Sequence, residues 1–403
     1  MKRLTFYVKA MAINFALLSF SFGASAQTSI QWQKCLGGTS DDEAHFIQQT
    51  LDGGYIVAGW TSSNDGDVSG NHGGTDYWIV KLDTIGNIQW QKTLGGTNGD
   101  EAFSIQQTLD GGYIVAGWTF SNDGDVSGNH GSTDYWIVKL DTIGNIQWQK
   151  TLGGTDYDEA YSIRQTLDGG YIVAGWTLSN DGDVTGNHGS TDYWIIKMDT
   201  IGNIQWQKCL GGNGGDEPYS IQQTSDGGYI VAGGSWSNDG DVTGNHGSTD
   251  YWIVKLDTIG NIQWQKCLGG TGNDEAFSIQ QTSNNEYIIA GWAWSNDGDV
   301  IGHHDSADYW VVKLIFSPTN IAEDINSPSY IKIYPNPFTD FINIDIGDKT
   351  ADVKLMNLLG QVVFSESLRQ NKNVVSGINI PAGVYILQVQ NSKIFSTQMV
   401  VKK

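Results

Sequence analysis

The sequence predicts an all-β protein that is built mainly from one repeated unit. A stretch of 58 residues recurs five times, and its Gln-Trp-Gln-Lys tetrad places tryptophan at positions 32, 90, 148, 206 and 264. Each copy contains short runs of strand-forming residues that are separated by Gly, Asp and Asn. A sustained helical period is absent from the repeats. A fixed period of this size indicates supersecondary units stacked in series.

The second copy illustrates the expected elements in order. Its strand-like runs are Ala102–Thr108, Tyr113–Thr119, Asp134–Leu140 and Ile146–Leu152. The Asp110-Gly111 pair between the first two runs supplies the positive φ of a tight hairpin, so neighbouring strands should be antiparallel. The second and third runs are apolar on both faces, as in a strand covered from both sides. Four such strands, repeated in series, predict the blades of a β-propeller.

The phase of the repeats predicts how the ring closes. The first copy begins with a fourth strand, Ile30–Leu36, and the last copy ends with a third strand, Asp308–Leu314. We therefore expect the N-terminal strand to pair with Tyr309–Leu314 and complete the last of five blades. Such closure would remove an open sheet edge that invites aggregation.

The order of motifs in each copy resembles a known repeat. Ala116-Gly-Trp-Thr119 precedes Ser121-Asn-Asp123, and Asp134-Tyr-Trp-Ile-Val-Lys-Leu-Asp141 precedes Leu152-Gly-Gly154 and Asp158-Glu-Ala160. This order is similar to bacterial β-propeller repeats of the SBBP type, over about 290 residues. The resemblance implies the propeller fold and no single activity. The family's name implies seven blades, whereas this chain carries five units.

The chain begins with a predicted signal peptide at residues 1–26. Lys2, Arg3 and Lys9 precede the apolar run Ala10–Phe22, and Ala24-Ser-Ala26 forms a cleavage site. The alternative, a membrane anchor, is disfavoured because the apolar run is too short to span a bilayer. The expected domains are residues 1–26, the propeller at 27–317, a linker at 318–330 and a small β-sandwich at 331–403.

The C-terminal segment has strand-like runs at Phe341–Ile346, Val353–Asn357, Gln361–Glu366 and Gly383–Gln390. Its motifs are Tyr334-Pro-Asn-Pro-Phe338, Asp340-Phe-Ile-Asn-Ile344, Asn357-Leu-Leu-Gly-Gln-Val-Val363, Ile380-Pro-Ala-Gly-Val-Tyr-Ile-Leu387 and the basic end Val401-Lys-Lys403. They resemble the type A C-terminal sorting domain of the type IX secretion system. The resemblance implies that residues 331–403 contact the secretion machinery, and that the protein is secreted or held on the outer surface of a Gram-negative bacterium. The alternative is a sandwich that binds a ligand itself.

Charge and cysteine content restrict the partners. The formal net charge of −22 disfavours nucleic acid and anionic membranes, and beyond the N-terminus no apolar segment is long enough to be transmembrane. The three cysteines, Cys35, Cys209 and Cys267, share one repeat position. Equivalent positions in different blades lie beyond the reach of a disulfide, so we expect unpaired thiols.

A long loop between the second and third strands offers possible calcium ligands. Asp65, Asp67, Ser69 and Asp76 occupy positions 1, 3, 5 and 12 of a calcium-type loop, with Gly70 at position 6. Further copies are Asp123, Asp125 and Asp134; Asp181, Asp183 and Asp192; and Asp239, Asp241 and Asp250. The fifth copy departs, with Ile301 at position 5 between Asp297, Asp299 and Asp308. The alternative is ordinary turn chemistry, in which the side chains bond their own backbone.

Histidine and tryptophan also recur in register. His72, His130, His188, His246 and His304 lie in the same loop, and we expect loop hydrogen bonds rather than a transition-metal site, because separate blades keep them apart. Tryptophans of the Tyr-Trp and Gln-Trp pairs are expected in the packed interior. The tryptophans at the end of the second strand are candidates for ligand binding: Trp60, Trp118, Trp176, Trp236 and Trp292.

The sequence predicts no catalytic residues and no cofactor beyond possible calcium. The candidate acids on the loop face are Glu43, Glu101, Glu159, Glu217 and Glu275. Glycoside hydrolysis needs two carboxyl groups in different environments, and near-identical blades offer equal ones. We therefore expect a non-enzymatic, lectin-like or adhesin-like module whose equivalent weak sites act together on a repetitive glycan or surface polysaccharide. The alternatives are a structural display protein without a ligand and a polysaccharide-degrading enzyme.

Overall fold

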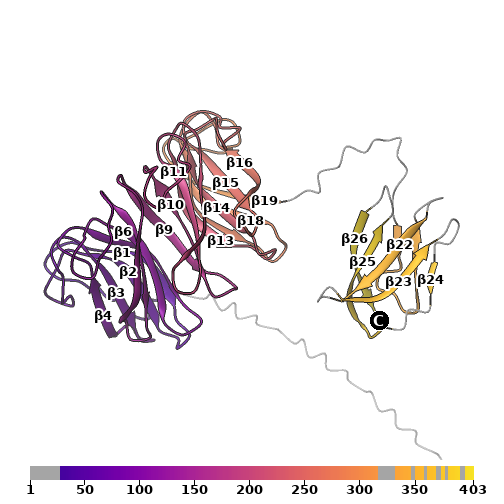
Figure 1. The fold of residues 1–403 in the computed structure, drawn as a ribbon, viewed down its shortest axis with the longest axis horizontal. Coiled ribbons are helices and arrows are strands. Elements are labelled where there is room, and N and C mark those ends of the chain that lie inside the picture. Colours follow the sequence, from indigo (N-terminus) through magenta and orange to yellow (C-terminus); the bar gives the residue numbers. More distant parts are fainter. Residues whose placement is uncertain are drawn as a thin grey trace, which may run out of the picture. The chain divides into compact units, whose positions relative to one another are not determined.

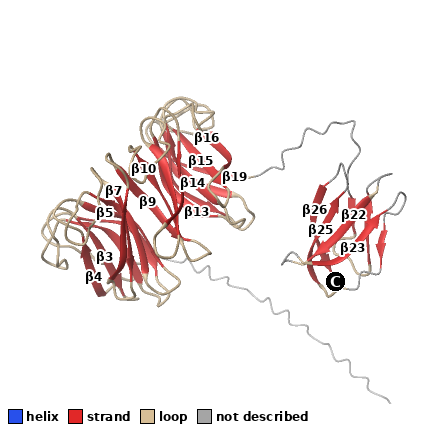
Figure 2. Ribbon diagram, viewed as in Figure 1, coloured by secondary structure: helices blue, strands red, loops and turns tan. Residues whose placement is uncertain are grey.

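The computed structural model describes residues 28–315, 332–345, 350–357, 361–368, 374–376, 380–390 and 395–403. The expected signal peptide and linker lie outside the described residues. The chain forms two compact units, one extending to Ile315 and one starting at Phe316. All elements in the described part are strands, joined by loops (Figure 2).

The first unit consists of five antiparallel sheets, one for each repeat (Figure 1). Four sheets have four strands in chain order, and the fifth has three. The strands are β1 (Asp42–Gln49), β2 (Tyr55–Thr61), β3 (Asp76–Leu82), β4 (Ile88–Leu94), β5 (Asp100–Gln107), β6 (Tyr113–Thr119), β7 (Asp134–Leu140), β8 (Ile146–Leu152), β9 (Asp158–Gln165), β10 (Tyr171–Thr177), β11 (Asp192–Met198), β12 (Ile204–Leu210), β13 (Asp216–Gln223), β14 (Tyr229–Ser235), β15 (Asp250–Leu256), β16 (Ile262–Leu268), β17 (Asp274–Gln281), β18 (Tyr287–Ala293) and β19 (Asp308–Leu314).

The hairpin between the first two strands forms as the Asp-Gly sequence predicts. Gly111 has a φ of 82°, and the Thr108 amide donates to the Gly112 carbonyl at 2.9 Å. The buried Lys139 reaches this turn from β7 and pairs with the Asp110 carboxylate at 2.9 Å. The third strand is therefore bound to the turn between the first two strands, in addition to its pairing with the second strand.

Neighbouring blades share one repeated junction. The Tyr135 hydroxyl of one blade donates to the Trp194 carbonyl of the next at 3.0 Å, and their ring centroids lie 4.6 Å apart. Both side chains are fully buried, in a cluster that also contains Ile137 and Ile196. The Tyr-Trp pairs therefore act as the interior packing that the sequence predicts.

The expected closure by the N-terminal strand is not formed. β19 pairs only with β18, and Ile30–Leu36 lies outside any strand in the described part of the chain. This segment packs against the first blade instead, with Trp32 and Tyr55 ring centroids 5.7 Å apart. β4 and β19 mark opposite ends of the row of sheets (Figure 1). The angle between blades is set by the shared junction, and repeating it five times does not bring β19 back to residues 30–36.

Among its described residues, the second unit contains two antiparallel sheets. One has the order β20 (Lys332–Tyr334), β21 (Phe341–Asp345) and β24 (Val374–Ser376); the other has the order β23 (Val362–Leu368), β22 (Ala351–Met356), β25 (Gly383–Gln390) and β26 (Phe395–Lys402). Its core contains Phe338, Val353, Leu355 and Leu387, all fully buried. The sequence-based expectations locate β21, β22, β23 and β25, but miss the short strands and β26.

Candidate functional site

The aspartates at positions 1 and 3 of each long loop bind the loop that connects neighbouring blades. In the second copy, Asp123 accepts hydrogen bonds from the Thr97 amide at 2.8 Å and the Thr97 hydroxyl at 2.9 Å. Asp125 accepts from the Gly95 amide at 3.4 Å. Asp65, Asp181, Asp239 and Asp297 bond the equivalent loop in the other copies. These carboxylates therefore accept hydrogen bonds from the neighbouring loop, as turn residues do.

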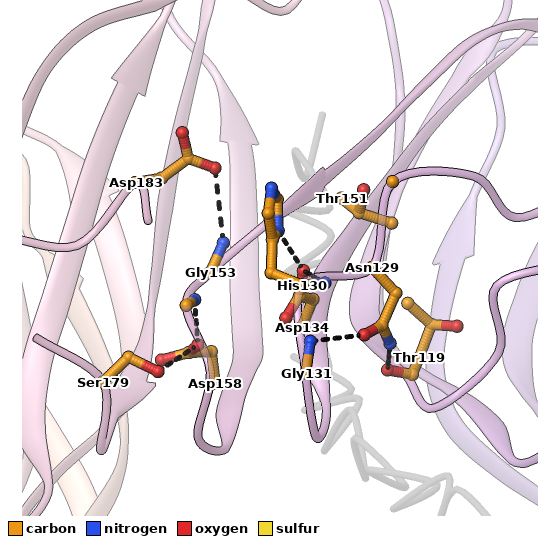
Figure 3. Close-up of polar contacts among 12 residues, drawn as sticks. Thr119, Asn129, His130, Gly131, Asp134, Thr151, Gly153, Asp158, Ser179 and Asp183 are labelled. Atoms are coloured by element: carbon orange, nitrogen blue, oxygen red, sulfur yellow. Dashed lines mark hydrogen bonds and ion pairs between the residues drawn. The ribbon is translucent and has the colours of Figure 1, made fainter. Parts of the chain in front are cut away.

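The twelfth-position aspartate faces the following junction. Asp134 is fully buried, and its Oδ2 atom lies 2.6 Å from His130 Nδ1 and accepts from the His130 amide at 3.0 Å (Figure 3). Burial raises the pKa of Asp134, although the histidine contacts oppose that shift. His72, His188, His246 and His304 make the same contact in their own loops. The histidines are loop hydrogen-bonding residues, as predicted.

The loop aspartates therefore do not converge as a twelve-residue calcium loop would require. Asp123 and Asp125 contact the Gly95–Thr97 segment, whereas Asp134 lies beside Gly153, which is the equivalent of Gly95 one repeat later. In the described part of the chain, no group of three or more His, Cys, Asp or Glu side chains is arranged to hold a metal ion. Calcium binding stays a prediction.

Acidic side chains instead meet at each junction, where two of them come from different blades. Asp158 is fully buried and accepts hydrogen bonds from the Gly154 amide at 2.8 Å, from the Ser179 hydroxyl at 2.9 Å and from the Thr177 hydroxyl (Figure 3). Burial, together with nearby Asp134, raises the pKa of Asp158 to about 6. A Cβ atom on Gly153 would lie 2.6 Å from Asp158 Oδ2 and 2.7 Å from Asp134 Oδ1. Both carboxyl groups can therefore lie this close to residue 153 only because it is a glycine and has no side chain.

The first strands carry a continuous line of ring side chains that the sequence analysis missed. This first-strand aromatic row consists of His45, Phe103, Tyr161, Tyr219 and Phe277. Successive ring centroids lie 4.5, 4.8, 5.3 and 4.8 Å apart. The sequence signal that could have revealed this row is a ring side chain at the same position of every repeat. It becomes a row because stacking places the first strands of successive blades side by side.

The five glutamates lie two residues before these rings, on the first strands. The Tyr161 hydroxyl donates to Glu159 at 2.8 Å, and the Tyr219 hydroxyl lies 2.8 Å from Glu217 and 3.1 Å from Glu275. Burial raises the pKa of Glu159 to about 7, with Glu101 and Glu217 adding to the shift. Glutamates of successive blades are therefore close enough to affect each other's charge.

The candidate tryptophans lie beside these glutamates, with one correction. Trp118 pairs with Glu101 across β6 and β5, and the same pairing joins Trp60 to Glu43, Trp176 to Glu159 and Trp292 to Glu275. Directly paired residues of antiparallel strands share a face of the sheet. The expected position of Trp236 at the end of the second strand is corrected: Gly234 occupies the equivalent position and pairs with Glu217, while Trp236 lies two residues further on and is 52% exposed.

Cavities follow the first strands. One of about 360 Å³ is lined by members of the aromatic row, together with Phe46 and Arg164, and one of about 700 Å³ is lined by Gln107, Gln165, Gln223 and Arg164. Arg164 stands where the other copies have glutamine, and its guanidinium lies 5.2 Å from the Phe46 ring centroid. We call the surface formed by the aromatic row, the first-strand glutamates with their paired tryptophans, and the first-strand glutamines the first-strand face. It has ring, carboxylate and amide groups that can contact a polar ligand.

The cysteines are unpaired, as predicted. Cys35 is exposed, whereas Cys209 and Cys267 are buried, and burial raises the pKa of the latter two to about 12. These two thiols are therefore protonated and unreactive at neutral pH.

Residues 332–403 match the family described as "Secretion system C-terminal sorting domain". This segment is the sorting domain that the sequence predicts, and it directs the protein through the type IX secretion system to the cell surface or the outside of the cell. Among the described residues, no helix is long and apolar enough to cross a membrane.

The chain is also similar to one protein in sequence and to several solved structures. The "Regulatory protein FlaEY" of Caulobacter vibrioides is 28% identical over 196 residues, which is 45% of this chain but only 20% of FlaEY. Among solved structures, the extracellular domain of BT4673 from B. thetaiotaomicron is 13% identical, with a TM-score of 0.34, over 91% of this chain and 51% of that one. A GH32 β-fructofuranosidase of Bombyx mori, in complex with sucrose, is 12% identical, with a TM-score of 0.32, over 89% and 87% of the two chains.

The prediction that the chain is not an enzyme is not upheld: the solved structures similar to this chain include glycoside hydrolases of families 32 and 43, with TM-scores of 0.31 to 0.32. One premise of that prediction also fails within the chain. Five equal repeats were expected to give five equal environments, yet Gly234 replaces tryptophan and Arg164 replaces glutamine on the first-strand face.

Proposed function

We propose that the repeat unit of this exported protein is a lectin-like or adhesin-like module that binds an extended glycan along the first-strand face. The observation that carries the proposal is the fixed association of a half-buried tryptophan with a glutamate in four of the five blades. Aromatic faces stack on sugar rings, and carboxylates accept hydrogen bonds from sugar hydroxyls. The net charge of −22 favours neutral or basic glycans over anionic ones.

The repetition of the pair supports attachment to a polymer. Each Trp-Glu pair offers little contact area, so its own affinity for a sugar is expected to be weak. Once one pair is bound, the next pair meets the same polymer at a high effective concentration, and overall binding can exceed single-site affinity by roughly 10²–10⁴. A repetitive ligand such as a surface polysaccharide therefore suits the arrangement better than a single small sugar.

The test is a glycan array with the full chain and with the Trp118→Ala, Trp176→Ala double variant. We expect saturable binding to a polymeric glycan and at least a tenfold loss in the double variant. Phe120→Ala is the matched control, because this ring is 44% exposed and lies outside the Trp-Glu pairs. Equal binding by all three proteins would overturn the proposal. Loss of thermal stability in the double variant, without any ligand on the array, would support a structural display protein instead.

Calcium is proposed as a stabiliser of the loops that flank this face. The support is the sequence spacing, in which Asp123, Asp125 and Asp134 take positions 1, 3 and 12 of a calcium-type loop in a pattern that four repeats share. The array is therefore run in calcium and in chelator, with a calorimetric calcium titration alongside. A titration without heat and unchanged binding in chelator would leave these loops as turn chemistry alone.

A further inference from the structure

The two ends of the row of blades expose the two halves of one interface. Inside the row, a tyrosine and an isoleucine on the third strand of each blade pack against the following blade. The four tyrosines are Tyr77, Tyr135, Tyr193 and Tyr251, and the four isoleucines are Ile79, Ile137, Ile195 and Ile253; all are fully buried. At the last blade, the equivalent Tyr309 is 97% exposed and Val311 is 61% exposed. The last blade therefore exposes the surface that donates the tyrosine hydrogen bond at the inner junctions, and we call this surface the donor half.

The first blade presents the matching acceptor half. Ile47 is 59% exposed, whereas its equivalents Ile105, Ile163, Ile221 and Ile279 are buried. Trp136, Trp194, Trp252 and Trp310 each receive a hydrogen bond at their carbonyl and a ring contact from the tyrosine of the preceding blade. Trp78 is the equivalent residue of the first blade, and the tyrosine that would serve it is Tyr309, at the other end of the row.

The missing strand of the last sheet is also present at the first blade. Residues Ile30–Leu36 read Ile-Gln-Trp-Gln-Lys-Cys-Leu, which is identical to β12 and β16, the fourth strands of two complete blades. The segment is already seated beside the first blade as a fourth strand would be: Trp32 contacts Tyr55, and Lys34 Nζ lies 3.2 Å from Asn87 Oδ1. The contacts Trp90–Tyr113 and Lys92–Asn145 are their equivalents inside the row.

We propose that the protein assembles head to tail, with Ile30–Leu36 of a second copy completing the last blade of the first. By the register of β15 with β16, Tyr309 would lie opposite Leu36 of the second copy, and Val311 opposite Lys34 of the second copy. The Tyr309 hydroxyl would donate to the Trp78 carbonyl of the second copy. The join would thus repeat the junction that the chain makes four times internally.

A second copy is taken as the occupant because the two halves are not joined within one chain in this structure, where β19 pairs with β18 alone. Residues 30–36 are held on the first blade, and β19 lies at the opposite end of the row (Figure 1). An unpaired strand edge with exposed apolar side chains is a ready template for another chain. The two surfaces differ, so the contact is heterologous and extends into a ring or a filament.

Disulfide trapping between separate variants tests this interface. In a Cys35→Thr background, which copies Thr93 and Thr151, we place Lys34→Cys in one full chain and Val311→Cys in another. These positions face each other across the proposed strand pair, within reach of a disulfide. With oxidised glutathione as the oxidant, we expect a cross-linked dimer when the two variants are mixed, and none from either variant alone.

Two outcomes would overturn the proposal. The first concerns a variant that carries both substitutions in one chain. If this variant cross-links within itself while the mixture of single variants does not cross-link, the ring closes on itself. The absence of any cross-link would show that residues 30–36 and β19 do not meet. As an independent readout, sedimentation of the unmodified chain should show species larger than a monomer that Tyr309→Lys removes. The matched control is Tyr157→Lys, at a tyrosine that is 44% exposed in a loop away from β19.

Discussion

At the scale of single residues, the junctions depend on glycines that let buried carboxyl groups approach the backbone. Gly153 has Asp158 on one side and Asp134 on the other, and both aspartates are fully buried. Neither can move away freely, because Asp158 accepts three hydrogen bonds and Asp134 is held by His130. The small size of residue 153 is therefore what permits the two blades to meet.

Gly153→Ala should consequently destabilise the repeat unit by about 1–3 kcal/mol, because the added methyl overlaps both carboxyl groups and buried overpacking is costly. Urea unfolding of the full chain, followed by tryptophan fluorescence, measures this difference. Gly99→Ala is the control, since its nearest side-chain atom would lie 3.1 Å away and the neighbouring loop can adjust. Equal stabilities of the two variants would show that the junction is loosely packed.

At the scale of elements, local chemistry was enough to predict the strands of the repeats. Tyr113–Thr119, Asp134–Leu140 and Ile146–Leu152 form as predicted, because turn residues such as Asp110-Gly111 determine where they end. The site was less predictable. The first-strand aromatic row joins residues 58 positions apart, and its members touch only once the blades are stacked. Closure failed for the same reason, because the angle between blades arises from packing and leaves no local mark in the sequence.

The Pro-Asn-Pro-Phe segment, another local motif, fastens the last strand of the sorting domain. Phe338 is fully buried, and its backbone bonds to β26 through the Val401 carbonyl and the Lys403 amide, both at 2.8 Å. Phe338→Ala should lower the stability of this unit by about 3–5 kcal/mol. We expect less protein in the medium and more inside the cell, measured by immunoblotting of both fractions. The melting of the repeat unit should not change, and an unchanged export level would contradict a structural role for the motif in secretion.

At the scale of the whole molecule, repetition multiplies the effect of each buried acid. Burial raises the pKa values of Asp100, Asp158 and Asp216 to about 6, and that of Glu159 to about 7. In the unfolded chain these groups titrate near 4. Between about pH 4 and pH 7 the folded state therefore retains protons that the unfolded chain has lost, and stability falls as the pH rises through this window.

We therefore expect the melting temperature of the repeat unit to be about 5 °C or more higher at pH 5 than at pH 8, measured by calorimetry at constant ionic strength. Below pH 4 the trend should reverse, because Asp168, whose pKa is lowered to about 2 by its hydrogen bonds and Lys197, then loses its charge. Glu159→Gln should raise the melting temperature at pH 8 and leave it nearly unchanged at pH 5, because the amide stays neutral at both. A melting temperature that increases steadily from pH 5 to pH 8 would mean that the buried acids are ionised in the folded state at little cost, and that the junctions contain water or cations that compensate them.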